Sequence, residues 1–161
     1  MIRLLKTVIV LFVALVCIFY ATQNVANLES MKGALSYVMS NQDHEVYVTS
    51  FGPAITNPYL VAFAVVIVLI GEFSAGLISL KGAWDMFRAR GASADEFQTA
   101  KKWALTGSLV GVLTWFGLFM AVGGAYFQMW QTAVGAESHS GAFTLAAVLG
   151  IIFLIVQSRD N

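Results

Sequence analysis

The sequence predicts an all-α integral membrane protein, a four-helix bundle with a short amphipathic helix in its first outer loop. Hydrophobic residues make up 58% of the 161 residues and charged residues only 11%, whereas a soluble domain usually carries about a quarter charged residues. Four apolar segments approach the ~20 residues that cross a bilayer as a helix. They cover residues 4–21, 58–80, 103–127 and 140–157 of what we expect to be one domain, 1–161.

The first segment, residues 4–21, could be read as a signal peptide because Arg3 and Lys6 precede it. Its apolar stretch is longer than the ~7–15 residues of a signal peptide, and no small-x-small cleavage site follows it. Cys17 follows the bulky Val16, which does not suit a lipoprotein cleavage site. We therefore expect a retained membrane helix.

Lysine and arginine residues predict the orientation, because cationic loops stay on the cytoplasmic side. Eight of the nine fall at the two ends of the chain or between the second and third segments, and only Lys32 falls in the other connections. The eight are Arg3, Lys6, Lys81, Arg88, Arg90, Lys101, Lys102 and Arg159. Both termini are therefore expected in the cytoplasm. The net charge is zero, so we expect lipid contacts and no nucleic-acid partner.

The connection after the first segment predicts a short helix that Asn27 can cap. Its apolar residues recur at helical spacing, as expected for an amphipathic helix. They are Leu28, Met31, Leu35, Val38 and Met39. Two arrangements stay open: a helix lying in the outer membrane interface, or a helix packed over the mouth of the bundle.

The second helix is expected to begin with Asn57 as its cap and Pro58 in its first turn. It should continue past the membrane toward Gly91, a residue type that suits the position just after a helix. Ser93 and Glu96 have the spacing of a capping box and should begin the third helix. The sequence thus predicts a helical hairpin that protrudes into the cytoplasm.

Glu72 is the only acidic or basic side chain within the 58–80 segment. Its position, 14 residues after Pro58, places it about 20 Å from the start of the helix. An acidic residue near the bilayer centre costs about 2.5–3.5 kcal/mol, so we expect Glu72 to turn toward a polar partner.

Matching depths on an antiparallel third helix make Thr114 and the indole N–H of Trp115 the candidate partners of Glu72. Gly107 and Gly111 form a G-x-x-x-G pair that permits close helix packing. Two interpretations of Glu72 stay open: a carboxyl group that handles protons or orients a substrate, and a neutral carboxyl group that clamps two helices or a partner protein together.

Few other residues suggest chemistry. His44 and His139 both fall outside the expected helices, so neither can ligate a haem inside the bundle. Nothing in their spacing predicts a metal site with the nearby acidic residues. Cys17 is expected to be an inert core residue. The sequence contains no recognisable catalytic set, so we expect no cofactor, no metal and no catalytic residue. Aromatic residues at the segment ends are typical of interfacial anchors.

Several stretches together resemble a bacterial family of predicted small integral membrane proteins with a domain of unknown function. They are QNVAN at 23–27, NQDH at 41–44, FGPAITNP at 51–58, GE at 71–72, LKGAWDMFRAR at 80–90, AKKWAL at 100–105 and WFGLFMAVGGAYFQMWQT at 115–132. The resemblance implies four spans in a bacterial inner membrane and no assigned activity. It also implies a binding surface at the outer end, for which the candidates are His44, Tyr126, Phe127, Met129 and Trp130.

Two functions follow as hypotheses. The first is an accessory, scaffolding or assembly subunit of a larger membrane complex. The second is a small transporter or proton-coupled permeation protein that uses Glu72 and works as a homo-oligomer, because few polar residues line its helices. An enzyme acting on lipids or quinones is a third, less supported hypothesis, which rests on the aromatic residues from Tyr126 to Trp130.

Overall fold

The computed structural model describes residues 1–160, and all of its regular secondary structure over that range is helical. The elements are α1 (Ile2–Ala26), α2 (Leu28–Met39), α3 (Pro58–Arg88), α4 (Ala94–Ala100), α5 (Lys102–Val112), the π-helix η1 (Leu113–Tyr126), the 3₁₀ turn η2 (Met129–Gln131) and α6 (Ala133–Gln157). α4, α5 and η1 join into one rod, Ala94–Tyr126. This rod, α1, α3 and α6 are the four helices long and apolar enough to cross a membrane, as the sequence predicts.

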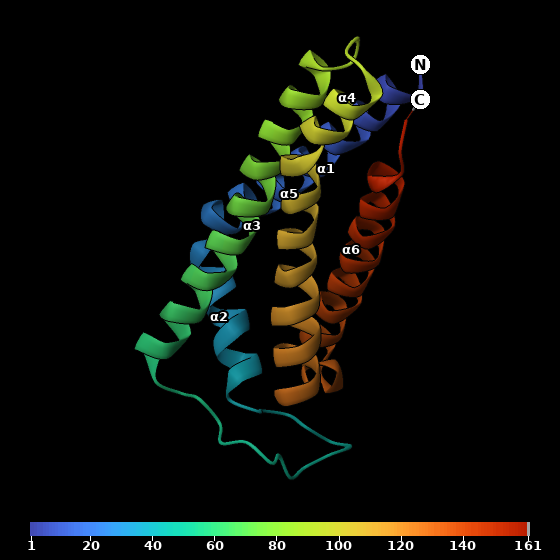
Figure 1. Cartoon of the computed structure of the whole chain (residues 1–161). Helices are drawn as coiled ribbons and strands as arrows, with labels where there is room; N and C mark the ends of the chain where they lie inside the picture. The colour runs from blue at the N-terminus through green and yellow to red at the C-terminus, as the bar shows by residue number, and fades with distance from the viewer. Residues whose placement is uncertain (161) are drawn as a thin grey trace.

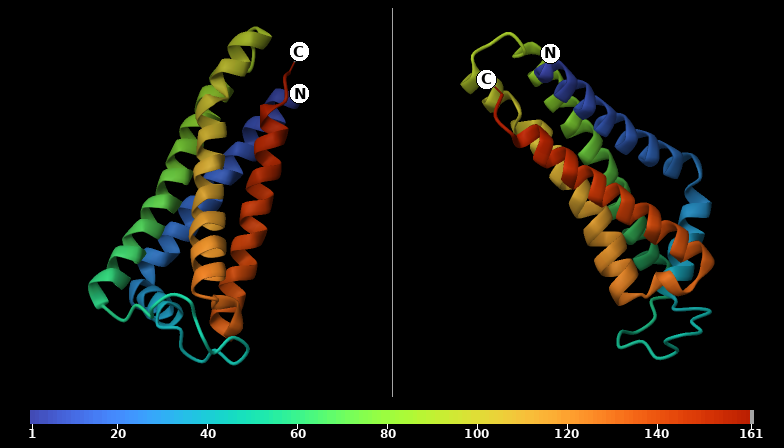
Figure 2. Two further views of the ribbon diagram at one scale, coloured as in Figure 1. Left: turned by 60° about the horizontal axis from the view of Figure 1, so that its bottom comes forward. Right: turned by 90° about the vertical axis from the view of Figure 1, so that its right-hand side faces the viewer.

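The two ends of the bundle differ in content. The N-terminus, the end of α6 and the turn from α3 to α4 lie together at one end, which we call the termini end (Figure 1). α2, the irregular segment 40–57 and the turn from η1 to α6 lie at the opposite end, the loop end (Figure 2). The eight cationic residues grouped by the sequence analysis all belong to elements that meet at the termini end.

Small residues bring α3 close to both of its main neighbours, α1 and α5. A Cβ atom added to Gly82 would lie 2.2 Å from the backbone nitrogen of Ala104 in α5. A Cβ atom added to Gly76 would lie 3.1 Å from the backbone nitrogen of Ile18 in α1. Helices in lipid associate largely through such close backbone approach. These contacts therefore hold the termini half of the bundle together.

Towards the loop end, α3 and the rod diverge (Figure 1), and α2 packs against α3 there. Met31 of α2 forms a buried cluster with Val65 and Val68 of α3. Met39 forms a second one with Val61 and Phe127. The predicted amphipathic helix therefore exists, and its apolar stripe packs onto the bundle, which is the second of the two arrangements left open.

The helix boundaries show which local predictions were correct. Asn57 caps α3 by accepting a bond from the Tyr59 backbone N–H at 2.9 Å, and Ser93 and Glu96 form the predicted capping box. Gly91 does not follow the helix end directly, because α3 already stops at Arg88. Asn27 makes no side-chain cap for α2; its Nδ2 instead donates to the Gln23 carbonyl of α1 at 2.9 Å.

α6 begins at Ala133, well before residue 140, where the predicted apolar segment starts. Thr132 caps it, because its Oγ1 accepts a bond from the Gly135 backbone N–H at 3.2 Å. The polar residues Glu137, Ser138 and His139 therefore form a helical turn in place of the expected connection. Hydropathy identifies only the apolar residues that suit lipid, whereas a capped helix can also include polar residues outside that apolar segment.

The π-helix η1 is the feature of the fold that the sequence did not predict. Its last bond runs from the Phe127 backbone N–H to the Val122 carbonyl at 3.0 Å, which is i→i−5. Wide turns of this kind are rare, and are frequent at functional sites. Residues about four to five apart share a face in such a helix. Leu118, Val122, Gly123 and Phe127 therefore line the same side of the rod, the side that faces the divergence from α3.

Candidate functional site

The carboxyl group of Glu72 is 1% exposed and lies between α3 and α1. The side-chain amide of Asn24, in the last turn of α1, donates from Nδ2 to both carboxyl oxygens, at 3.0 Å to Oε1 and 2.9 Å to Oε2. These two bonds tie α1 to α3 at the level where α1 ends. The pair thus supplies the polar partner that a carboxyl group inside the bundle requires.

The predicted partners of Glu72 were wrong, because neither Thr114 nor Trp115 bonds to it in the structure. Thr114 Oγ1 donates to the Val110 carbonyl of its own rod at 2.9 Å. Hydroxyl groups satisfy themselves in this way in helix interiors. Trp115 is buried, with its ring edge-on to that of Tyr20 at 6.2 Å between centroids.

The prediction chose partners for Glu72 from the third helix at the same depth in the membrane. The last turn of α1 also lies at the level of Glu72 and supplies the partner. The signal that could have found the true partner is the polar stretch QNVAN at the end of the first apolar segment. Its Asn24 is the residue that reaches Glu72. Thr114 still lies close by, since a Cβ atom at Gly71 would be 2.5 Å from its Oγ1.

The two glycines of the G-x-x-x-G pair contact different helices. A Cβ atom at Gly107 would lie 2.6 Å from the backbone nitrogen of Ser79 in α3. A Cβ atom at Gly111 would lie 2.6 Å from the side chain of Leu149 in α6, and 3.7 Å from that of Ala75. Both positions are buried. The pair therefore allows α5 to pack between α3 and α6.

The aromatic residues at the loop end hold the segment 40–57 onto the bundle. Tyr126 lies edge-on to Phe51 of that segment, with 5.0 Å between ring centroids, and 4.7 Å from Phe127. Trp130 lies edge-on to Tyr47 at 5.6 Å. The nearby Gln131 accepts bonds at Oε1 from the backbone N–H groups of residues 46 and 47. Tyr126 and Trp130 are thus contacts of the loop.

Phe127 and Met129 instead point inward, and both are 5% exposed. Both line an apolar cavity of about 400 Å³. Its lining comes mainly from α2, α3 and η1, and Ile55 of the segment 40–57 and Val134 and Ser138 of α6 complete it. Of the five outer-end candidates, Phe127 and Met129 are therefore the two that line a cavity able to hold a molecule.

The two histidines lie apart from this cavity. His44 belongs to the irregular segment and is partly exposed. His139 of α6 packs on the rod, so that a Cβ atom at Gly124 would lie 2.5 Å from its Nε2. Among residues 1–160, no three His, Cys, Asp or Glu side chains are placed to share a metal ion.

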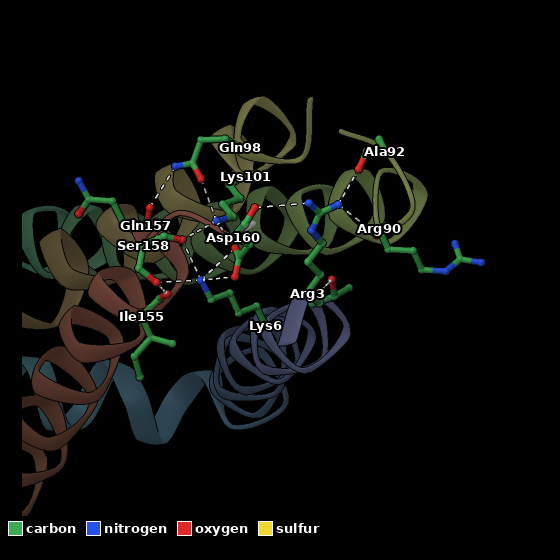
Figure 3. A network of polar contacts seen from close by, with 11 residues as sticks. Arg3, Lys6, Arg90, Ala92, Gln98, Lys101, Ile155, Gln157, Ser158 and Asp160 are labelled. Carbon is green, nitrogen blue, oxygen red and sulfur yellow. Dashed lines mark hydrogen bonds and ion pairs between the residues drawn. The ribbon is translucent and has the colours of Figure 1, made fainter. Parts of the chain in front are cut away.

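A cluster of buried charges at the termini end was missed by the sequence analysis (Figure 3). Asp160 follows α6, and its carboxylate lies between two lysines that point at it from different parts of the fold. Lys6 of α1 lies with Nζ 2.8 Å from Oδ1, and Lys101, between α4 and α5, bonds to Oδ2. Lys101 is 0% exposed. The two lysines were interpreted only as topology signals, because the sequence does not show that the tail folds back between them.

Further bonds anchor the same tail. Both lysine ammonium groups donate to the Ser158 carbonyl, Lys6 at 2.8 Å and Lys101 at 2.7 Å. Arg3 donates to the Ala92 carbonyl at 2.6 Å, which ties α1 to the α3–α4 turn. Cations also suit a helix C-terminus, where carbonyl groups lack partners. Burial raises the pKa of Asp160, but the bonds from Lys101 and Lys6 outweigh it and hold the pKa below its ordinary value.

We call Lys6, Lys101 and Asp160 the ion lock. It joins α1, the start of α5 and the C-terminal tail, and therefore closes the termini end of the bundle.

Comparison with known proteins bears on the whole chain. A family model described as "Predicted small integral membrane protein (DUF2165)" matches residues 2–157. Neither the curated proteins nor the solved structures contain a match to the chain.

Proposed function

We propose that this chain, which belongs to the family of predicted small integral membrane proteins (DUF2165), functions within a larger membrane assembly. Its role in that assembly is accessory: it acts as a scaffolding or assembly subunit of a bacterial inner-membrane complex. Both termini face the cytoplasm. The observation that carries the proposal is a rigid, exposed aromatic and cationic surface on the α3–α4 hairpin.

The orientation rests on the positive-inside rule. Eight of the nine lysine and arginine residues belong to elements of the termini end, and Lys32 of α2 belongs to the loop end. In the proposed orientation, the hairpin lies in the cytoplasm and the segment 40–57 lies outside the cell.

The hairpin extends beyond the lipid. α3 has 31 residues, and a helix of this length measures about 46 Å, whereas the hydrocarbon core is about 30 Å thick. The excess of about 15 Å is a stiff support, since the capping box restarts the chain as α4 within a few residues.

Trp84, Phe87 and Arg90 form the hairpin surface. Trp84 and Phe87 stack at 6.4 Å between ring centroids, and the Arg90 guanidinium lies 4.1 Å from the centre of the Phe87 ring. Trp84 is 59% exposed. Tryptophan and arginine are enriched among the residues that dominate binding energy in protein interfaces, and this surface presents both on a supported helix.

The interior of the bundle also favours a structural role. The Glu72 carboxyl group is bonded to Asn24 within the same chain, so it acts as a clamp between α1 and α3. The ion lock closes the termini end at the same time. A clamp within the bundle and an ion lock at one end suit a subunit that presents fixed surfaces to a partner.

The test is solubilisation of native membranes in mild detergent at native expression, followed by blue native electrophoresis. The protein is expected in a complex larger than itself, with other polypeptides at fixed stoichiometry. Trp84→Ala and Arg90→Glu should release it from the complex without lowering its abundance. Trp130→Ala, a matched tryptophan substitution at the loop end, should leave the complex intact. A protein that runs alone, or only as a self-oligomer, contradicts the proposal.

The permeation hypothesis keeps one specific observation in its favour, a single buried carboxyl group among apolar helices. Glu72→Gln removes the ability to carry a proton and keeps the side-chain volume. If this variant abolishes proton-coupled flux into vesicles at unchanged abundance, Glu72 handles protons. If abundance falls instead, the carboxyl group is the clamp described above.

A further inference from the structure

The apolar cavity at the loop end is a groove that opens sideways from the bundle. α3 and the rod pack closely at Gly82, Gly107 and Gly71, and they diverge towards the loop end (Figure 1). α2 covers the back of the resulting gap, and its Ala34 and Leu35 form the floor. In the view of Figure 1, no helix crosses the front of the gap between α3 and the rod. In a membrane, this open side faces hydrocarbon.

The groove has the depth of one leaflet. On α3 its lining runs from Leu60 to Val68, a separation of eight positions that corresponds to a rise of about 12 Å. Half of a ~30 Å hydrocarbon core is about 15 Å. Phe127 and Met129, which follow η1 at the loop end, belong to the lining, and Ser138 of α6 adds a hydroxyl group to it. An extended chain in the groove would therefore start at the interface and end near the bilayer centre.

The walls suit a flexible chain better than another helix. This protein packs its own helices through glycine, alanine and serine, as at Gly82 with Ala104, which is the general rule in lipid. The groove walls carry bulky side chains instead, among them Phe63, Ile67, Leu118 and Val122. Water has no polar partner along such walls. The volume of about 400 Å³ lies within the range of small-molecule pockets, about 300–1,000 Å³.

From this geometry we propose that the groove between α3 and η1 binds one acyl chain of a phospholipid from the leaflet at the loop end. The lipid head group lies at the rim near Ser138, and the chain follows the face of η1 that its π-helical turns place toward α3. The lipid fills the space between the diverging helices and is enclosed on three sides, so it exchanges more slowly than the surrounding lipid. This inference is independent of the accessory role, since it needs no protein partner.

Native mass spectrometry tests the proposal on the full chain. The protein is reconstituted in vesicles of phosphatidylethanolamine and phosphatidylglycerol, extracted into mild detergent and analysed for retained lipid. The wild-type chain is expected to keep one phospholipid. Ala64→Trp fills the groove from its α3 wall and should lower retention at least tenfold. Ala147→Trp, on an exposed position of α6 outside the groove, should retain as much lipid as the wild type.

Ala34→Phe fills the groove from the floor and gives the same prediction if Ala64→Trp reduces the amount of folded protein. Protein purified from native membranes identifies the natural occupant by lipid analysis. A glycerophospholipid supports the proposal, whereas an isoprenoid or a polypeptide in its place overturns it. Wild-type protein without retained lipid, or groove variants that retain as much as the Ala147→Trp control, also overturns it. None of these results depends on whether the protein enters a larger complex.

Discussion

Replacing Asp160 by asparagine tests whether the ion lock holds the termini end closed. Asp160 accepts bonds from two buried ammonium groups, Lys6 and Lys101. The substitution removes the negative charge and leaves two like charges close together in a buried site. Breaking a buried ion pair by removing one partner typically costs about 3–5 kcal/mol. We expect a loss of stability in that range for Asp160→Asn.

Thermal unfolding in detergent, followed by tryptophan fluorescence, measures this loss. For a chain of this size, 1 kcal/mol shifts Tm by about 2–4 °C, so the expected decrease in Tm is about 6–20 °C. The matched control is Asp95→Asn, which removes an exposed ion pair with Arg159 at 2.6 Å. Exposed pairs contribute little to stability, so this variant should unfold like the wild type.

The double variant Lys6→Met with Asp160→Asn shows how much of the lost stability comes from repulsion between the ammonium groups of Lys6 and Lys101. With one ammonium group removed, the remaining Lys101 keeps its bonds to the Ser158 carbonyl and to Gln98. The double variant should therefore lose less stability than the sum of the single variants, as coupled neighbours do. An Asp160→Asn protein with the Tm of the wild type, or additive single effects, would refute the reasoning.

Three other predictions concern pH, the buried clamp and helix packing. Because the pKa of Asp160 is lowered in the folded protein, its stabilising effect should be complete above its ordinary pKa of 3.8 and be lost as the pH falls below that value. In an acid titration, the wild type should be more stable than Asp160→Asn above this pH, and the two stabilities should converge as the pH falls below it. Asn24→Ala should destabilise the protein by about 1–3 kcal/mol, because it leaves a buried carboxyl group unpaired. Glu72→Gln should destabilise it less. Unfolding in SDS measures both losses of stability, and equal losses would contradict the clamp. Gly82→Ala should weaken the α3–α5 contact and lower Tm, while Gly117→Ala, whose Cβ meets no atom within 4 Å, should not; equal Tm values would show that close approach at Gly82 is unimportant.

Local sequence signals predicted the helices of this protein well. The four long helices follow from apolar segments, because hydropathy is a sum over nearby residues. The caps at Asn57 and Ser93 were also correct, since a cap depends on atoms within one turn. The early start of α6 shows the limit of the method: Thr132 caps the helix ahead of a polar turn that hydropathy excludes.

The candidate site could be predicted only in part. Glu72 was correctly expected to turn inward to a polar group, because a carboxyl group in lipid requires one. Its partner Asn24 lies 48 residues away in the sequence, and nothing local distinguishes it from Thr114. The depth argument considered only the third helix, whereas α1 ends beside Glu72 and brings its polar last turn into contact.

The sequence by itself determined that this chain spans a membrane with four helices, where most of these helices begin and end, and which end collects the cationic residues. Each of these properties depends on residues that are neighbours along the chain. The tertiary structure alone decided which polar groups pair, as Asp160 does with Lys6 across 154 residues. It also decided the groove, because that space exists only where α3 and η1 separate after packing on their small residues. Such features depend on which faces of distant helices meet, and this is set by the packing free energy of the whole bundle.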